Sequence, residues 1–224
     1  MPDNEYQRLN KELHALTEIA KAITFPLELP GLLEAVMKTI VSVLDPADIG
    51  AIMLWDQASM LFRPAAAVGY DMEIFKEISL HAGESITGKA FHDGHAKLLS
   101  TPAEVARTME DMRSSNREIM ARSIGSSDLP KSAVSAPIFV GETKYGVLVL
   151  ESLDPVNPFV EADLPFVQSL ADLVALAIER QQLEAHAAFV RDARQAERMR
   201  SEVMATLSHE LRMPLSAIKG YATA

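Results

Sequence analysis

Residues 132–153 read SAVSAPIFVGETKYGVLVLESL, and this stretch decides the fold class that the sequence predicts. Two apolar runs, 132–140 and 145–153, flank the short polar segment 141–144, which begins with a glycine. Apolar runs joined by a short glycine-containing segment are typical of a β-hairpin. We therefore expect an antiparallel pair of strands, Ser132–Val140 and Tyr145–Leu153, joined by a turn at Gly141–Lys144.

Further strands and helices are expected on both sides of this hairpin. Residues 49–55 and 60–68 read as a strand pair joined by a turn at 56–59, and shorter strands are expected at 77–80 and 96–99. Periodic apolar residues predict helices over about 5–23, from 32 to just before Pro46, from Pro102 to about Arg122, and from Asn157 onward. Elements in this order predict an α+β fold, an antiparallel sheet flanked by helices.

Three phrases in this region resemble the GAF domain family. They are residues 83–90 (GESITGKA), 136–138 (API) and 145–152 (YGVLVLES). The resemblance covers residues 27–180 and implies a GAF-like sensor domain, preceded by an N-terminal dimerisation helix over residues 1–26. It names no ligand, because GAF domains bind cyclic nucleotides, bilins, haem, small anions or nothing. The cofactor of this domain, and its possible small-molecule ligand, therefore stay unknown.

Composition excludes several classes of partner. The net charge of −10 argues against nucleic acid and against an anionic membrane surface. The absence of cysteine excludes disulfides and the covalent attachment of a bilin through a thioether. No apolar run reaches the about 18 residues that a membrane span requires, and the N-terminus is acidic, unlike a signal peptide. We expect a cytoplasmic protein without a membrane span.

A segment near the C-terminus carries the candidate chemistry. Residues 208–215 read SHELRMPL within a helical run. At about 100° per residue, His209 points nearly opposite to an apolar face formed by Leu207, Leu211, Pro214 and Ile218. A neutral imidazole on the polar face of a helix is accessible to a partner, and the neighbouring Glu210 can orient the ring and accept its proton.

Residues 204–221 resemble the H-box of the sensor histidine kinases of bacterial two-component systems. The resemblance implies that His209 is the phospho-acceptor and that Glu210 acts as general base or orienting group. It also implies transfer of the phosphoryl group to an aspartate of a response regulator receiver domain. ATP and Mg²⁺ would be bound by a separate catalytic domain, whose Asn-, Asp- and Gly-rich nucleotide boxes the sequence lacks. We therefore expect the chain to be the N-terminal part of a longer kinase, inactive alone.

One position of this segment departs from the family pattern. Four residues after the histidine most sensor kinases carry Thr or Asn, which positions a water for dephosphorylation of the regulator. This chain has Met213, which shares a helix face with His209 and forms no useful hydrogen bond to water. Phosphoryl acceptance is unaffected, and regulator phosphatase activity is in doubt. Met213 also supports the alternative hypothesis, a non-catalytic GAF ligand-binding and dimerisation module with a degenerate H-box.

The helix that leads to this segment predicts a homodimer. No Pro or Gly occurs between Phe166 and Arg212, and helix propensity stays high through residues 181–201. A helix without a core of its own is most simply a parallel two-chain coiled coil, so we interpret 181–201 as a signalling helix. Residues 202–224 then form the first helix of the dimerisation and phospho-acceptor hairpin. Residues 5–23 carry their own heptad seam, at Leu9, Leu13, Leu16, Ala20 and Ile23.

Three other patterns are weaker indications of function. Residues 83–89 fit the phosphate-binding pattern G-x-x-x-x-G-K, but Ala90 stands where a Mg²⁺-binding hydroxyl is needed, so a glycine-shaped helix start is favoured. His92 and His95 are too few to predict a metal site. His81 or His92 could ligate haem, although neither lies in a matching motif. A soft apolar stripe on the helix after Pro102 favours core or dimer packing over a ligand lid; it consists of Met109, Met112 and Met120.

Overall fold

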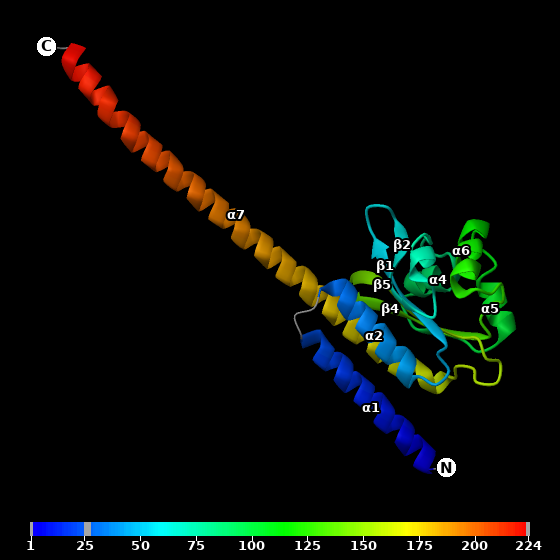
Figure 1. Cartoon of the computed structure of the whole chain (residues 1–224). Coiled ribbons are helices and arrows are strands. Elements are labelled where there is room, and N and C mark those ends of the chain that lie inside the picture. Colours follow the sequence, from blue (N-terminus) through cyan, green and yellow to red (C-terminus); the bar gives the residue numbers. More distant parts are fainter. Residues whose placement is uncertain (1, 25–27, 223–224) are drawn as a thin grey trace. The chain divides into compact units, whose positions relative to one another are not determined.

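The computed structural model describes the backbone of residues 2–24 and 28–222, and the side chains of residues 6–24 and 28–204. The chain divides into two compact units, residues 1–179 and residues 180–224. The first unit contains the sheet and most of the helices (Figure 1). The second contains only helix, because α7 runs over Leu164–Ala222 and crosses the boundary between the units.

A five-stranded antiparallel sheet forms the centre of the first unit, in the order β2-β1-β5-β4-β3. The predicted hairpin is confirmed: β4 (Ser132–Val140) pairs with β5 (Thr143–Ser152), and the turn between them is two residues shorter than expected. β1 (Ile49–Asp56) pairs with β5 on one side and with β2 (Leu61–Val68) on the other. The short β3 (Lys97–Leu99) completes the edge beside β4.

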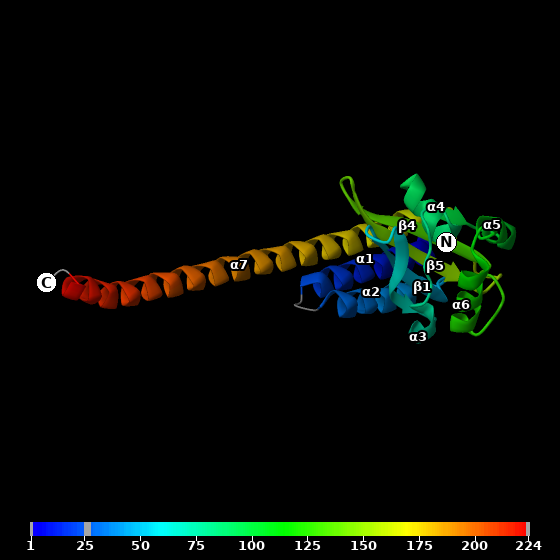
Figure 2. The same cartoon turned by 90° about the horizontal axis from the view of Figure 1, so that it is seen from above.

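Three helices cover one face of the sheet. α2 (Leu29–Val43) and the first turns of α7 pack their apolar sides on this face, and α1 (Pro2–Thr24) packs on α2 (Figures 1 and 2). The alternation of side chains along a strand sends Leu148 and Leu150 of β5 into this layer. Most side chains of this core are apolar, and the buried hydroxyl of Ser132 at its edge accepts a hydrogen bond from the Phe159 N–H.

The opposite face is covered by short helices, and it is here that the candidate site forms. These helices are α3 (Met72–Phe75), α4 (Ser85–Asp93), α5 (Pro102–Thr108) and α6 (Ser114–Ile124). Val147 and Val149 of β5 face this second layer, together with Met53 of β1. The arrangement confirms the predicted α+β fold, with helices on both sides of an antiparallel sheet.

Several predicted elements differ from those observed. The helix expected from Pro102 to Arg122 is two helices, α5 and α6, because residues 109–113 leave the helical path to bind α4 and the turn before it. Residues 77–80 form one bridge, between Leu80 and Phe62, and α3 was not predicted. The long helix begins at Leu164, after a 3-10 turn at Glu161–Asp163, and not at Asn157.

The second unit is a helix with exposed apolar side chains. Leu183, Phe189, Met199, Val203 and Met204 are each more than half exposed. Within the residues that the structure describes, no helix is both long enough and apolar enough to cross a bilayer.

The packing of β5 against β1 makes a specific prediction at Gly146. A Cβ atom at this position would clash with the carbonyl oxygen of Met53. We expect Gly146→Ala to lower the free energy of unfolding by about 1–3 kcal/mol, measured by urea denaturation. The control is Gly31→Ala in α2, where no atom lies within 4 Å of the added methyl group. That change should raise the stability by about 0.5–1 kcal/mol. Equal effects of the two substitutions would contradict this account of β5.

Candidate functional site

A small cavity of about 30 Å³, the inner cavity, lies between the sheet and the short helices of the second layer. Its walls are mostly Met, Ile, Leu and aromatic side chains, with a few polar groups among them. The lining residues come from β1, β5, α3, α4, the end of α5 and α6: Ala51, Met53, Tyr70, Phe75, Ile78, Leu80, Ser85, Ile86, Thr87, Met109, Met112, Met120, Val149 and Glu151. An apolar cavity with few convergent polar groups is the usual form of a small-molecule site.

Glu151 is the one acidic side chain in the wall of this cavity. It lies on the central strand β5, opposite Ile49 of β1 and Ala133 of β4, and is 4% exposed. The Tyr70 hydroxyl donates a hydrogen bond to Glu151 Oε2. The Tyr70 ring stacks on Phe75, with 4.2 Å between the ring centroids, so its orientation is fixed by packing. The pair joins the sheet to the segment that begins α3.

Burial dominates the protonation of this pair. It raises the pKa of Glu151 to about 7, although the hydrogen bond from Tyr70 acts in the opposite direction. Burial and the nearby carboxylate also raise the pKa of Tyr70 well above its ordinary value, so the phenol keeps its proton and acts as a donor. Few carboxyl groups in proteins have a pKa near neutrality, and those that do are often found at functional positions.

A second buried carboxylate, Glu84, directly precedes Ser85 of the cavity wall. Its oxygens accept hydrogen bonds from the backbone N–H groups of His81 (2.9 Å) and Arg113 (3.1 Å). They also accept from Asn116 Nδ2 at 3.0 Å and from Arg113 Nε at 3.3 Å. Burial disfavours its charge and is the largest single effect, but these donors together outweigh it and lower the pKa of Glu84. Arg113 and Asn116 each also donate to the carbonyl oxygen of Ser79, which ties α6 to the turn before α4.

The side chain of Asp111 caps the N-terminus of α4. Asp111 Oδ1 accepts a hydrogen bond from the Ser85 N–H at 3.0 Å, and Asp111 Oδ2 lies 3.0 Å from Lys89 Nζ. A carboxylate therefore occupies the position that a phosphate takes in a phosphate-binding loop. Gly88 packs so closely on the 81–83 turn that a Cβ atom would clash with the His81 carbonyl oxygen. These contacts account for the glycines of residues 83–89 without a nucleotide.

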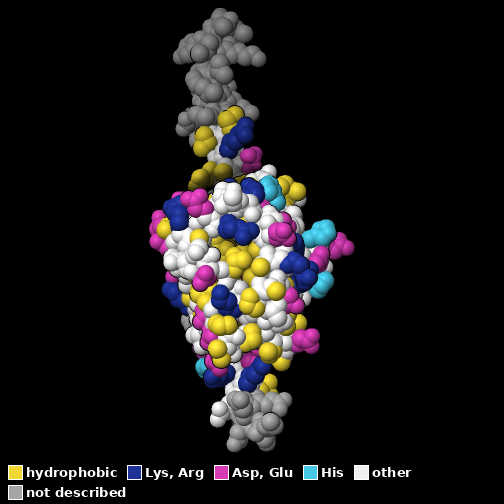
Figure 3. Space-filling view, turned by 90° about the vertical axis from the view of Figure 1, so that its right-hand side faces the viewer, with side chains coloured by type: hydrophobic (Ala, Val, Ile, Leu, Met, Phe, Trp, Pro, Cys, Tyr) yellow, Lys and Arg dark blue, Asp and Glu magenta, His cyan; other side chains and the backbone are white. Residues whose placement is uncertain are grey.

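An outer cavity of about 400 Å³ lies next to the inner cavity, on the surface. α6 and residues 126–129 form most of its wall, including Ala121, Ile124 and Leu129. Met112 and Met120 line both cavities, so their side chains form the partition between them. The view onto the side of α5 and α6 shows hydrophobic side chains gathered between charged ones (Figure 3). The predicted methionine stripe is buried core, as favoured, and also borders a site.

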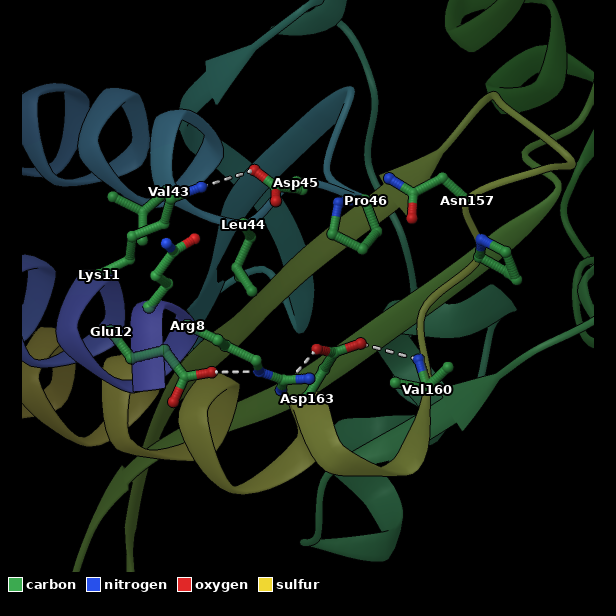
Figure 4. A pocket seen from close by; sticks show the side chains of 12 residues that line it. Arg8, Lys11, Glu12, Val43, Leu44, Asp45, Pro46, Asn157, Val160 and Asp163 are labelled. Carbon is green, nitrogen blue, oxygen red and sulfur yellow. Dashed lines mark hydrogen bonds and ion pairs between the residues drawn. The ribbon is translucent and has the colours of Figure 1, made fainter. Parts of the chain in front are cut away.

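A more open and more polar cavity, of about 630 Å³, lies between α1, the end of α2 and residues 157–163 (Figure 4). Its charged groups are satisfied by one another. Arg8 bonds to Glu12 at 2.7 Å and to Asp163 at 2.9 Å, and Lys11 lies 3.5 Å from Asp45. Asp163 also accepts a hydrogen bond from the Val160 N–H at 2.7 Å. These contacts fix α1 to the start of α7, which is a structural role, and we do not assign a ligand to this cavity.

The three histidines named as candidate ligands from the sequence do not line the inner cavity. His81, His92 and His95 are exposed, and the described residues contain no group of three acidic or histidine side chains placed to hold a metal ion. His209, Glu210 and Met213 belong to the helical backbone of α7, but their side chains lie outside the described residues.

Sequence reasoning missed the two residues at the centre of the cavity. Glu151 ends the apolar run Val147–Leu150 within a strand, and an acidic residue in a strand buried on both faces is a recognisable signal. Tyr70 carries no comparable signal, because it follows a turn glycine and its position depends on contacts with distant residues.

Comparison with known proteins identifies the first unit. The family model for the GAF domain matches residues 26–179. The GAF domain of a phosphoenolpyruvate-protein phosphotransferase from Coxiella burnetii superposes with a TM-score of 0.65 at 20% identity, covering 79% of this chain and 97% of that one. Free methionine-R-sulfoxide reductase from Neisseria meningitidis, in complex with its substrate, superposes with a TM-score of 0.59 at 16% identity, covering 77% and 91%. These similarities establish the fold alone.

A curated relative adds a weaker indication. The sensor protein KdpD of Escherichia coli (strain K12) is 34% identical over 86 residues, which is 38% of this chain. The matching region spans 10% of the length of KdpD.

The raised pKa of Glu151 predicts a pH dependence of stability. Because the pKa rises from an ordinary value of 4.5 to about 7 on folding, the folded state binds the proton more tightly. The stabilisation is complete below about pH 4.5 and is lost as pH rises to about 7. We expect the stability of the wild type relative to Glu151→Gln to fall by about 2 kcal/mol between pH 5.5 and pH 8.

The measurement is urea denaturation of both proteins at several pH values. Glu110→Gln, an exposed acid on the segment between α5 and α6, serves as control and should follow the wild type. Parallel curves for the wild type and Glu151→Gln would show that Glu151 is ionised at all these pH values.

Proposed function

Because the chain belongs to the GAF domain family, we propose that residues 26–179 are the sensory input domain of a histidine kinase of a two-component system. The observation that carries the proposal is the segment 204–221, which resembles an H-box and contains His209 beside Glu210. The similarity to the sensor protein KdpD supports the same function. In this proposal the signal is a ligand of the inner cavity, which Glu151 and Tyr70 line.

The proposed chemistry is phosphoryl transfer through His209. The neutral imidazole attacks the γ-phosphorus of ATP in line, a nitrogen–phosphorus bond forms, and the bond to the bridging oxygen of ADP breaks. Glu210 orients the ring and accepts the proton that the imidazole loses. The phosphoryl group then passes to an aspartate of a response regulator receiver domain. ATP and Mg²⁺ would be held by a separate catalytic domain, and the protein would act in the cytoplasm.

An exposed apolar row on α1 supports a homodimer. Tyr6, Leu9 and Leu13 are 68%, 62% and 60% exposed, and they follow one another at steps of three and four residues. The side of α1 that packs on its own chain carries Ala15, Ile19 and Ile23 instead. A second helix with the same spacing can cover the exposed row by knobs-into-holes packing. We therefore propose that this row pairs with α1 of a second copy.

A non-catalytic function is the alternative. In that case the GAF domain binds a small molecule, the long helix only dimerises, and the H-box is degenerate. Met213 in place of Thr or Asn favours this alternative. The two functions differ in one respect: the kinase requires the imidazole of His209, and the binding module does not.

Phosphorylation of the full-length gene product tests the kinase proposal. Incubated with Mg²⁺ and γ-labelled ATP, the wild type should acquire label that acid removes and base does not, as expected for phosphohistidine. His209→Gln should lose the label, because an amide cannot accept the phosphoryl group. His186→Gln, an exposed histidine on the same helix, is the matched control and should keep it. Absence of label from the folded wild type would reject the kinase and leave the binding module.

The dimer is tested by substitution of the exposed row. Leu13→Glu places a carboxylate on the apolar row and should convert the dimer to a monomer, measured by analytical ultracentrifugation over a range of concentrations. His14→Glu adds the same side chain at the next position, which is exposed on another side of α1, and should leave the dimer intact. A Leu13→Glu protein with the sedimentation behaviour of the wild type would exclude this row from the interface.

A further inference from the structure

Among the described residues, Glu151 is a buried carboxylate with few hydrogen-bond donors around it and no cation in the wall of the cavity. In the described part of the chain, the Tyr70 hydroxyl is its one side-chain partner, and no Lys, Arg or His lines the cavity. The backbone offers it no donor either, because β5 pairs with β1 and β4 on both sides. A buried carboxylate normally has a cation or several hydrogen-bond donors. Glu84, in the same layer, has such donors: the backbone N–H groups of His81 and Arg113 and the side-chain amide of Asn116.

Two hydroxyl groups line the same cavity. They belong to Ser85 and Thr87, which are 2% and 5% exposed. A hydroxyl oxygen and a carboxylate oxygen are both acceptors for an N–H group. The wall of the cavity therefore combines a carboxylate with two hydroxyl oxygens that can accept hydrogen bonds from a ligand.

The dimensions of the two cavities indicate the shape of the ligand. A volume of about 30 Å³ holds a group the size of one or two waters, such as an ammonium group, and no larger organic body. The outer cavity of about 400 Å³ is separated from it by Met112 and Met120. Methionine side chains are flexible and rearrange at low cost, so a narrow chain can pass between them.

We propose that the inner cavity binds the head of a primary alkylammonium ligand, with Glu151 as its counter-ion and its apolar chain passing Met112 and Met120 into the outer cavity. The ammonium group donates hydrogen bonds to Glu151 and to the hydroxyls of Ser85 and Thr87. The inference rests on the proposed sensory function, because it names the chemical class of the signal.

Protonation of Glu151 gives the binding a pH dependence. Below the pKa of about 7 the carboxyl must release its proton before it can pair with the ammonium ion, so affinity should rise with pH up to this value. Tyr70 is the other titratable group in the wall and stays protonated. The charged groups around α4 are paired with one another: Glu84 with Arg113, and Lys89 with Asp111.

Calorimetric titration of the 224-residue chain with n-hexylamine and with 1-hexanol at pH 8 tests the proposal. The two probes have the same carbon chain, and only the amine is charged. We expect the amine to bind at least about tenfold more tightly to the wild type, and to lose this advantage in Glu151→Gln. Glu110→Gln is the control and should bind as the wild type does. Equal binding of amine and alcohol, no binding of the amine, or unchanged binding to a folded Glu151→Gln would each overturn the proposal.

A second measurement needs no variant. The association constant of the amine for the wild type should rise roughly eightfold from pH 5.5 to pH 6.5 and change little from pH 7.5 to pH 8.5. A constant affinity over this range would overturn the assignment of Glu151 as counter-ion. If n-hexylamine does not bind, the proposal that His209 is phosphorylated still stands. If no phosphohistidine forms, the proposal of amine binding still stands, so the two experiments test the two proposals separately.

Discussion

The burial of β5 is the constraint on which the rest of the structure depends. The strand is bordered by β1 and β4 and is covered by helices on both faces. Every side chain from Val147 to Ser152 is buried and must therefore be apolar or find a partner inside the protein. Val147–Leu150 satisfy the first condition, and Glu151 has to satisfy the second. The position of Tyr70, and with it the start of α3, follows from this need.

Two buried glutamates in the same layer show how local donors decide protonation. Glu84 accepts hydrogen bonds from two backbone N–H groups, an amide and a guanidinium, and its pKa lies below the ordinary value. Glu151 has one phenol as donor, and its pKa is raised to about 7. Burial opposes the charge of both groups, so the number and kind of donors make the difference. Glu84 serves as a structural link, whereas Glu151 retains capacity to accept a further donor.

The sequence predicted the parts of the fold that depend on local patterns. The β4–β5 hairpin, the β1–β2 pair and the apolar helices follow from periodicity that neighbouring residues carry. The break between α5 and α6 could not be predicted in this way. It arises because Asp111 and Arg113 bind the start of α4, more than twenty residues earlier in the chain. The Tyr70–Glu151 pair joins residues 81 positions apart, and the periodicity of neighbouring residues carries no information about such a contact. His209 is the opposite case, since its prediction rests on a local motif alone.

The two faces of β5 connect the cavity to the helical layer. Val149 lines the cavity, and its neighbours Leu148 and Leu150 pack in the core that includes the first turns of α7. A ligand can change the arrangement of that core only if it binds two arrangements of β5 with different affinity. A rigid apolar cavity gives no difference in affinity, because its walls contact the ligand equally in both arrangements of β5. The proposed ion pair would give a difference in affinity, because its strength depends on the distance between Glu151 and the ligand charge. In the proposed sensor, the carboxylate on the central strand is therefore the group that would couple ligand binding to the arrangement of the helical layer.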